Sequence, residues 1–210
     1  MKLKIQYNSP VVLTYTLICV AVTFFDWMIY GDFAKSANFP NTVTGQFFTL
    51  YPNKMSFDSV LSYFRVFSHS MGHGGWNHLL GNFSFILLIG PILEERYKSG
   101  PLLIMILLTA TITGILQTIF FRSALLGASG IVFMMILLVS FTNFKSGSIP
   151  LTFILVAILY LGKEMFNAVN PSPGTQNISQ FAHIIGGLCG GLFGYVINQK
   201  NMLQDKQPES

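Results

Sequence analysis

A serine and a histidine that could act together as nucleophile and base lie far apart in this sequence, each beside glycines. Ser129 lies in the motif GASG (residues 127–130) and His183 in the motif AHIIG (residues 182–186). Both residues fall near the starts of apolar segments long enough to cross a membrane. A hydroxyl and an imidazole are costly in hydrocarbon unless they have polar partners, so their positions indicate chemistry inside a bilayer.

The composition fits that setting, because 51% of the 210 residues are hydrophobic and only 10% are charged. The charges fall between apolar runs close to the ~20 residues that a spanning helix needs. We expect an all-α, polytopic membrane protein in which residues 1–198 form a single domain with six spans, followed by a polar C-terminal tail at 199–210. The spans are expected near residues 10–30, 76–93, 101–121, 127–143, 150–168 and 179–198. The first is too long for the core of a signal peptide and has no small-residue cleavage site.

The charge distribution predicts the topology of these spans. Seven basic residues fall on one side and four on the other, with Lys163 inside a span. These are Lys2, Lys4, Arg96, Lys98, Lys145, Lys200 and Lys206 against Lys35, Lys54, Arg65 and Arg122. Cytoplasmic loops carry the excess of Lys and Arg, so both termini are expected in the cytoplasm. The expected location is the cell (inner) membrane. The connection from residue 31 to residue 75 then lies outside, as an interfacial or re-entrant loop rather than a second domain.

The same composition excludes other classes of partner. A net charge of +4 is small and dispersed, and no stripe of basic and aromatic residues accompanies it, so nucleic acid is not an expected partner. Cys19 and Cys189 fall inside predicted spans, where cysteine behaves as a small apolar residue. The lipid bilayer is the expected surrounding.

This topology brings four polar side chains to a common depth. Spans two, four and six all begin on the outer side, where they carry His78 and Asn82, Ser129, and His183 respectively. The spacing i, i+4 places His78 and Asn82 on one helix face. At ~1.5 Å per residue, His183 lies about 6 to 8 Å below the outer end of its helix.

A row of glycines on the sixth span predicts a helix-packing face beside His183. Gly186, Gly190 and Gly194 repeat every four residues, which makes a smooth surface for close helix contact. A neighbouring helix can then approach closely enough to bring its serine to His183.

These motifs together resemble the rhomboid intramembrane serine proteases over about residues 61–195. The resemblance is carried by H-x4-H-x3-N at His73, His78 and Asn82, by E-x-R at 94–96, by G-x-S-G at 127–130, and by A-H-x-x-G-x-x-x-G at 182–190. It implies a six-helix rhomboid-like bundle with Ser129 as nucleophile, His183 as general base, and His78 and Asn82 beside the oxyanion. It also implies that the fifth helix gates substrate entry and that the segment after it caps the site.

Two positions depart from the family pattern. The Trp-Arg pair of the first outer loop is Phe64-Arg65, and the aromatic residue one turn after the serine, often Tyr, is Phe133. Phe133 can still support the histidine ring by stacking under it, but it cannot donate a hydrogen bond.

The chemistry of these groups predicts a two-residue mechanism without cofactor or metal. His183 takes the proton of Ser129 and later delivers it to the leaving amine. The glycine face can hold the ring where an aspartate does so in a triad. Asp26 and Glu164 are expected to serve helix ends or loop contacts. The backbone N–H of Ser129, aided by the helix dipole, is expected to stabilise the oxyanion together with Asn82 and His78.

Hydrolysis also needs water and an accessible peptide bond. Residues 122–128 are expected to be non-helical backbone lining an aqueous pocket, since such backbone is tolerated at membrane depth only against a cavity or protein. Expected substrates are transmembrane segments with small or helix-breaking residues near their outer ends, because cleavage requires local unwinding of the helix.

Two alternatives remain open from the sequence. A metal-dependent membrane hydrolase could use His69, His73 and His78, although there is no His-Glu-x-x-His motif and glycines at 72, 74 and 75 argue against a continuous helix there. A non-catalytic, substrate-binding membrane protein of the same fold, or a transporter, is the other alternative, and the presence of both Ser129 and His183 counts against it.

Overall fold

The computed structural model describes residues 7–32, 38–56, 58–140 and 180–204, with a few further positions between 151 and 159. Over these residues the chain is helical, and an isolated bridge between Leu50 and Leu125 is the one β feature found there. The all-α class is therefore confirmed. The helices are α1 (Pro10–Tyr30), α2 (Val43–Phe47), α3 (Val60–Ser68), α4 (Trp76–Tyr97), α5 (Ser99–Phe120), α6 (Ser129–Ser140) and α8 (Gln180–Gln204), with short 3-10 turns η2 (Phe39–Asn41), η3 (Pro52–Lys54) and η4 (His69–Met71).

Five of the helices correspond to predicted spans. α1, α4 and α5 are long and apolar enough to cross a membrane, and α6 and residues Phe181–Ile197 of α8 are shorter apolar helices. Most of the predicted fifth span, 150–168, lies outside the described residues. α4 continues past the predicted end at 93, since its last turn carries the charged residues 94–96 as a polar helix end. α8 continues to Gln204, so the predicted tail at 199–210 begins as helix, built from good helix formers such as Gln, Lys, Met and Leu.

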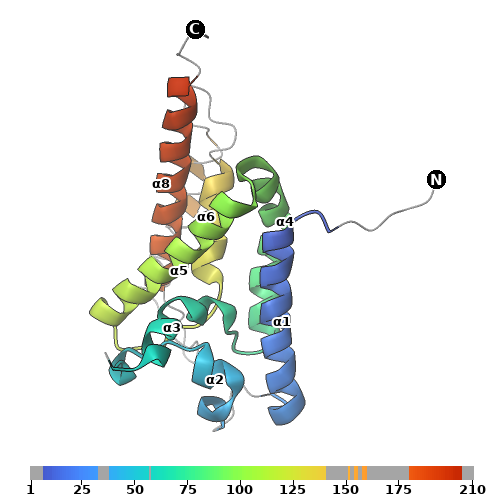
Figure 1. The fold of residues 1–210 in the computed structure, drawn as a ribbon, viewed down its shortest axis with the longest axis vertical. Helices are drawn as coiled ribbons and strands as arrows, with labels where there is room; N and C mark the ends of the chain where they lie inside the picture. The colour runs from blue at the N-terminus through green and yellow to red at the C-terminus, as the bar shows by residue number, and fades with distance from the viewer. Residues whose placement is uncertain are drawn as a thin grey trace, which may run out of the picture.

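The helices form two packed pairs with α5 lying across them (Figure 1). α1 packs on α4, α6 packs on α8, and α4 also contacts α6. α6 and α8 both begin at their lower ends in the view, on the side of the bundle where α2 and α3 lie. α1 begins, and α8 ends, toward the upper end. The arrangement therefore brings the starts of α6 and α8 together at one end of the bundle.

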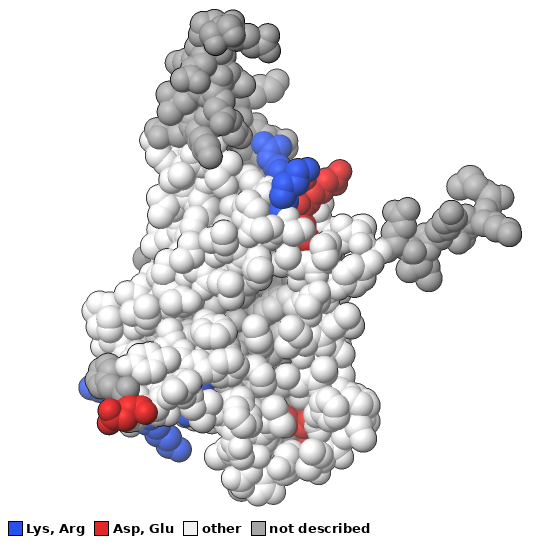
Figure 2. Space-filling view, viewed as in Figure 1, with Lys and Arg blue, Asp and Glu red and all other residues white. Residues whose placement is uncertain are grey.

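The surface has the charge pattern of an integral membrane protein. Figure 2 shows charged side chains gathered near the two ends of the visible face, with a broad uncharged band between them. Large apolar side chains such as Leu17, Ile29, Leu88, Ile104 and Ile119 are exposed on α1, α4 and α5. Exposed apolar surface on this scale suits a surrounding of lipid chains, which agrees with the three helices of spanning length.

Two buried carboxylates cap the starts of other helices. Glu94, late in α4, accepts hydrogen bonds from the N–H groups of Val11 at 2.9 Å and Val12 at 3.0 Å, in the first turn of α1. Asp26, late in α1, accepts from Val43 and Thr44 at the start of α2, both at 2.7 Å. The unpaired amides and the positive end of the helix dipole favour a carboxylate at these places. The expectation that Asp26 serves a helix end is confirmed, while Glu164 lies outside the described residues.

The described part of the long connection between α1 and α4 folds back onto the bundle. Tyr15 of α1 donates its hydroxyl to the carbonyl of Ser70 at 2.7 Å, and Arg65 donates from Nε to the carbonyl of Gln46 at 2.8 Å. α3 lies directly on α5 at Gly114, where an added Cβ would come within 2.9 Å of the carbonyl carbon of Val66. These contacts fix the segment that follows, from His69 to Gly75, which enters the candidate site.

Candidate active site

The segment before Ser129 is an extended loop held by backbone hydrogen bonds, consistent with the prediction of non-helical backbone at 122–128. Leu125 exchanges two such bonds with Leu50, each 2.9 Å long, and the N–H of Gly127 donates to the carbonyl of His69 at 2.8 Å. Gly127 has φ +111°, a conformation that side chains rarely allow. The loop therefore places Ser129 at the first position of α6, half-buried at the lower end of the bundle.

His78 and Asn82 lie against this loop. A Cβ added to Gly127 would stand 2.7 Å from His78 Nε2 and 3.7 Å from Asn82 Nδ2. Glycine is thus required at 127 for space as well as for its φ. The N–H of Gly74 donates to His78 Nδ1 at 3.2 Å, so in a neutral ring the proton sits on Nε2. His78 therefore presents an N–H donor to the segment that leads into Ser129.

The predicted glycine face of α8 lies directly against α6. A Cβ added to Gly186 would stand 2.7 Å from the carbonyl carbon of Gly130, and one added to Gly190 would stand 2.9 Å from that of Met134. Gly194 is buried as well. The two backbones touch at Gly130, one residue after Ser129, and again at Met134. Helix contact this close requires small residues at the crossing.

His183 lies at this contact and is stacked on an aromatic ring of α6. The centroids of the His183 and Phe133 rings are 4.4 Å apart, and the ring planes differ by 11°. His183 is 8% exposed and is therefore buried at this interface. Phe133 follows Ser129 by one helical turn, so the stacked ring lies on the serine's side of the interface. The structure thus places His183 beside the helix that Ser129 begins, and His78 and Asn82 beside the loop that precedes Ser129.

His69 and His73 are held by backbone groups beside the site. His69 Nε2 lies 3.1 Å from the carbonyl oxygen of Ala110, and His73 Nδ1 lies 3.3 Å from that of Met71. Burial lowers the pKa of His69 to about 4, and burial together with the nearby His78 lowers the pKa of His73 to about 3. Both rings are therefore neutral at physiological pH. In the part of the chain that the structure describes, no three His, Cys, Asp or Glu residues are grouped so as to hold a metal ion.

Reasoning from the sequence missed two contacts that stabilise the candidate site. The ring of His73 packs edge-on against His78, at a centroid distance of 5.1 Å, and against Phe83 at 5.6 Å. The carbonyl of His69 accepts the hydrogen bond that fixes Gly127. The motif H-x4-H signalled His73, but its role as a packing partner depends on tertiary structure. A backbone acceptor such as that of His69 leaves no signal in the sequence.

The chain belongs to the rhomboid family. Residues 61–200 match the family model described as the Rhomboid domain. This range includes the loop before Ser129 and the whole contact between α6 and α8. The resemblance noted from the motifs is therefore confirmed at the level of the family.

Individual relatives agree with this assignment. The chain is 31% identical to Rhomboid-related protein 1 of Caenorhabditis elegans over 87% of its own length and 53% of the relative, and 30% identical to RHOMBOID-like protein 4 of Arabidopsis thaliana over 65% and 37%. It is 24% identical to the rhomboid protease GlpG of Haemophilus influenzae over 97% of its own length and 100% of that protein. The chain thus spans about half or less of the length of the first two relatives.

The contact between α6 and α8 gives a direct mutational prediction. Gly186→Ala places a Cβ against the backbone of Gly130, and such overpacking costs about 1–3 kcal/mol, more than the ~1 kcal/mol that alanine gains in a helix. We expect a lower melting midpoint and lower activity together. Gly187→Ala is the matched control, since its Cβ would stand 3.4 Å from Leu137 Cδ1, an ordinary contact. Equal midpoints for the two variants would show that the crossing is looser than the structure has it.

Proposed function

We propose that this protein is an intramembrane serine endopeptidase that cleaves transmembrane segments of membrane-protein substrates near their outer ends. One observation carries the proposal. The close α6–α8 contact and the stacking of His183 on Phe133 of α6 support a Ser129–His183 pair, and His78 and Asn82 lie beside the loop that precedes the serine. The relative from Haemophilus influenzae, aligned over its full length, is named a protease.

In the proposed reaction His183 removes the proton of Ser129 as its oxygen attacks the peptide carbonyl. His183 then gives that proton to the leaving amine, and an acyl group remains on Ser129. A water molecule, deprotonated by His183, attacks the ester and releases the serine with its proton restored. The stacked Phe133 ring holds the imidazole and attracts its cationic form in the transition state.

A dyad without a third, acidic residue agrees with the places of the carboxylates. Asp26 and Glu94 are each occupied by two backbone N–H groups at helix starts. In this proposal the packing of α8 on α6 and the ring of Phe133 orient His183, as an aspartate does in a triad. Orientation of the base is the part of a triad that packing can replace.

Three donors are proposed to stabilise the oxyanion. Ser129 is the first residue of α6, so its N–H has no partner within the helix and lies at the positive end of the helix dipole. Asn82 Nδ2 is buried and has no hydrogen-bond partner among the described residues. His78 presents its Nε2–H. Donors arranged in advance for a developing negative charge are often the largest contribution to catalysis of acyl transfer.

A small cavity behind the loop that precedes Ser129 could hold water for the hydrolysis. Its volume is about 10 Å³, and its lining includes His69, Thr113, Gly127 and Gly130. This is about the volume that one water molecule needs. The polar atoms His69 Nδ1 and Thr113 Oγ1 face no other hydrogen-bond partner among the described residues. The cavity therefore offers a polar place for one water molecule beside the start of α6.

The proposed setting is a cell (inner) membrane with both termini in the cytoplasm. The predicted excess of basic residues on that side supports it, and so do the start of α1 and the end of α8, which lie toward the same end of the bundle (Figure 1). The candidate site then opens on the outer side. The predicted gate and cap, at the fifth span and the segment after it, lie mostly outside the described residues and stay predictions.

A fluorophosphonate probe tests the class of enzyme. We expect it to label Ser129 in the detergent-solubilised protein and a chelator to leave labelling unchanged, because the probe needs only an activated serine. Ser129→Ala should not be labelled, whereas Ser140→Ala, at the far end of α6, should be labelled like the parent. Activity that is lost with EDTA and restored by zinc would favour the metal-dependent hydrolase. A folded protein that the probe does not label would favour the non-catalytic alternative.

A further inference from the structure

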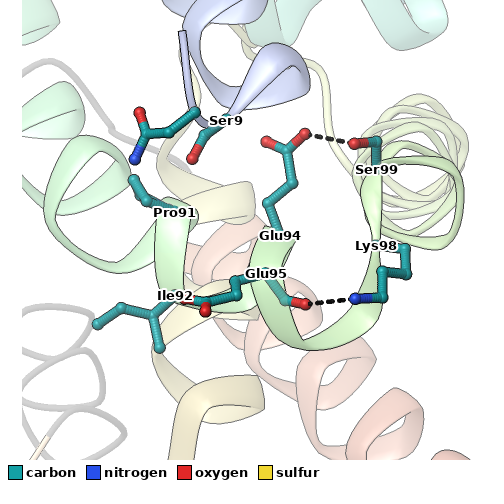
Figure 3. Close-up of a pocket in the computed structure, with 8 residues that line it drawn as sticks. Ser9, Pro91, Ile92, Glu94, Glu95, Lys98 and Ser99 are labelled. Atoms are coloured by element: carbon teal, nitrogen blue, oxygen red, sulfur yellow. Dashed lines mark hydrogen bonds between the residues drawn. The ribbon is translucent and has the colours of Figure 1, made fainter. Parts of the chain in front are cut away.

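A polar cavity lies at the opposite end of the bundle from Ser129 and has no part in the proposed reaction. Its volume is about 520 Å³, and it is situated where α1 begins, α4 ends and α5 begins. Figure 3 shows Ser9, Glu94, Glu95, Lys98 and Ser99 around it. The cavity is thus lined by hydroxyl, amide and ionic side chains together with the apolar side chains of Pro91 and Ile92, at the edge of the apolar band.

The cavity offers one positive and one negative group to a ligand. Glu94 is already occupied, because its carboxylate accepts from Val11, Val12 and the hydroxyl of Ser99, the last at 2.7 Å. Glu95 and Lys98 are exposed and adjacent, and Lys98 Nζ lies 3.4 Å from the main-chain oxygen of Glu95. A ligand that carries both signs of charge would complement this pair.

An apolar groove of about 330 Å³ adjoins the polar cavity and runs between α1 and α5. Ser99 lines both spaces, and Ser9 of the cavity is followed directly by Pro10 and Val11 of the groove. Ile18 of α1 and Leu103 of α5 form part of its walls. From Ser99 to Ala110, α5 rises about 16 Å along the groove.

The groove presents little polarity of its own. Tyr15 lines it, but its hydroxyl donates to the carbonyl of Ser70 at 2.7 Å, and Thr14 is paired with the hydroxyl of Tyr7 at 2.8 Å. A polar cavity that continues into an apolar groove has the shape and polarity of a lipid, with the headgroup at the membrane edge and a chain along the helices.

We propose that the cavity and the groove together bind one phospholipid with an ethanolamine headgroup. Its phosphate pairs with Lys98, its ammonium pairs with Glu95, and one acyl chain fills the groove between α1 and α5. An anionic headgroup would leave Glu95 without a partner, and a choline headgroup has no N–H to donate to it. The lipid would tie α1 to α5 where a groove separates them, independently of any catalysis at Ser129.

Native mass spectrometry of the delipidated protein tests the headgroup. Phosphatidylethanolamine, phosphatidylglycerol and phosphatidylcholine with identical acyl chains are added separately. We expect one phosphatidylethanolamine to be retained at least tenfold more strongly than the others and to raise the melting midpoint. Glu95→Gln and Lys98→Gln should each weaken retention at least tenfold. Arg96→Gln, exposed beside them but not lining the cavity, should retain the lipid like the parent. Equal retention of the three lipids, or preference for phosphatidylglycerol, would overturn the proposal.

A matched pair of tryptophan variants tests the groove. Leu103 and Leu108 lie on the same helix and are 43% and 45% exposed, but only Leu103 lines the groove. Leu103→Trp should abolish retention of phosphatidylethanolamine, and Leu108→Trp should leave it unchanged. Leu107→Trp, which also fills the groove, is a second variant in case the first does not fold. Equal effects of Leu103→Trp and Leu108→Trp would overturn the groove assignment. Ser129→Ala should bind the lipid normally, which separates this test from the test of catalysis.

Discussion

Cleavage of a transmembrane substrate is expected to fall by about 10⁴- to 10⁶-fold in Ser129→Ala and in His183→Ala, because nucleophile and base act as one unit. The double variant should be no slower than either single one. The geometry motivates this expectation, since Ser129 begins α6 and His183 is stacked on Phe133 across the closest contact between α6 and α8. The measurement is single-turnover cleavage of a reconstituted substrate by each variant at equal concentration.

The folded state of each variant must be checked on the same preparation. Ser129→Ala removes one hydroxyl from a half-buried position, so we expect little change in its melting midpoint. Ser140→Ala is the matched control on α6, where the serine hydroxyl only bonds back to the carbonyl of Ile136 at 3.0 Å. It should cleave like the parent. Losses that add up in the double variant would mean that one of the two residues acts outside the dyad.

Most of the helical framework could be predicted from composition and spacing alone. Apolar runs bounded by charges place α1, α4 and α5 well, because a spanning helix must satisfy its own backbone and needs about 20 apolar residues whatever its neighbours are. The boundaries near charged residues were less predictable. Glu94 was expected to close the second helix, but its role as a cap on α1, whose Val11 lies 83 positions away, could not be predicted.

The helix faces around the candidate site could be predicted from the sequence, but their geometry could not. Periodicity identifies His78 and Asn82 as one face, and glycines every four residues identify the contact of α8. The position of Gly127 against His78 Nε2 could not be derived, because it depends on the hydrogen bonds that hold the serine loop to His69 and to Leu50. Such long-range backbone contacts leave almost no trace in residue types.

The hydrogen-bond pattern around His78 shows what the structure adds to the sequence. Sequence reasoning could place this residue near the oxyanion but could not say which nitrogen carries the proton. The bond from the Gly74 N–H to Nδ1 leaves Nε2 as the donor of a neutral ring. Nε2 also lies beside Gly127. The structure therefore identifies the nitrogen of His78 that can donate and the backbone segment that it faces.

Asn82→Ala is expected to reduce turnover by about 10²- to 10³-fold, or roughly 2.7 to 4 kcal/mol, without abolishing it. The amide Nδ2 is buried beside the serine loop and has no partner among the described residues, as expected of a donor reserved for the reaction. Because Ser129 and His183 remain, the variant should still react with a fluorophosphonate, only more slowly. Substrate affinity should change little, since the donated bond strengthens mainly as negative charge develops.

The alternative role for Asn82 is to hold helices together, and the two roles give opposite results. Asn77, exposed on the same helix, supplies the matched control, and Asn77→Ala should resemble the parent in every measurement. If Asn82 is an oxyanion donor, Asn82→Ala keeps its melting midpoint within the range of that control while turnover falls. If it only links helices, the midpoint falls and the folded fraction keeps its full turnover number, because the remaining donors and the dyad are intact. Turnover and melting midpoint measured on one preparation therefore decide between them, and normal turnover with lowered stability would reject the oxyanion assignment.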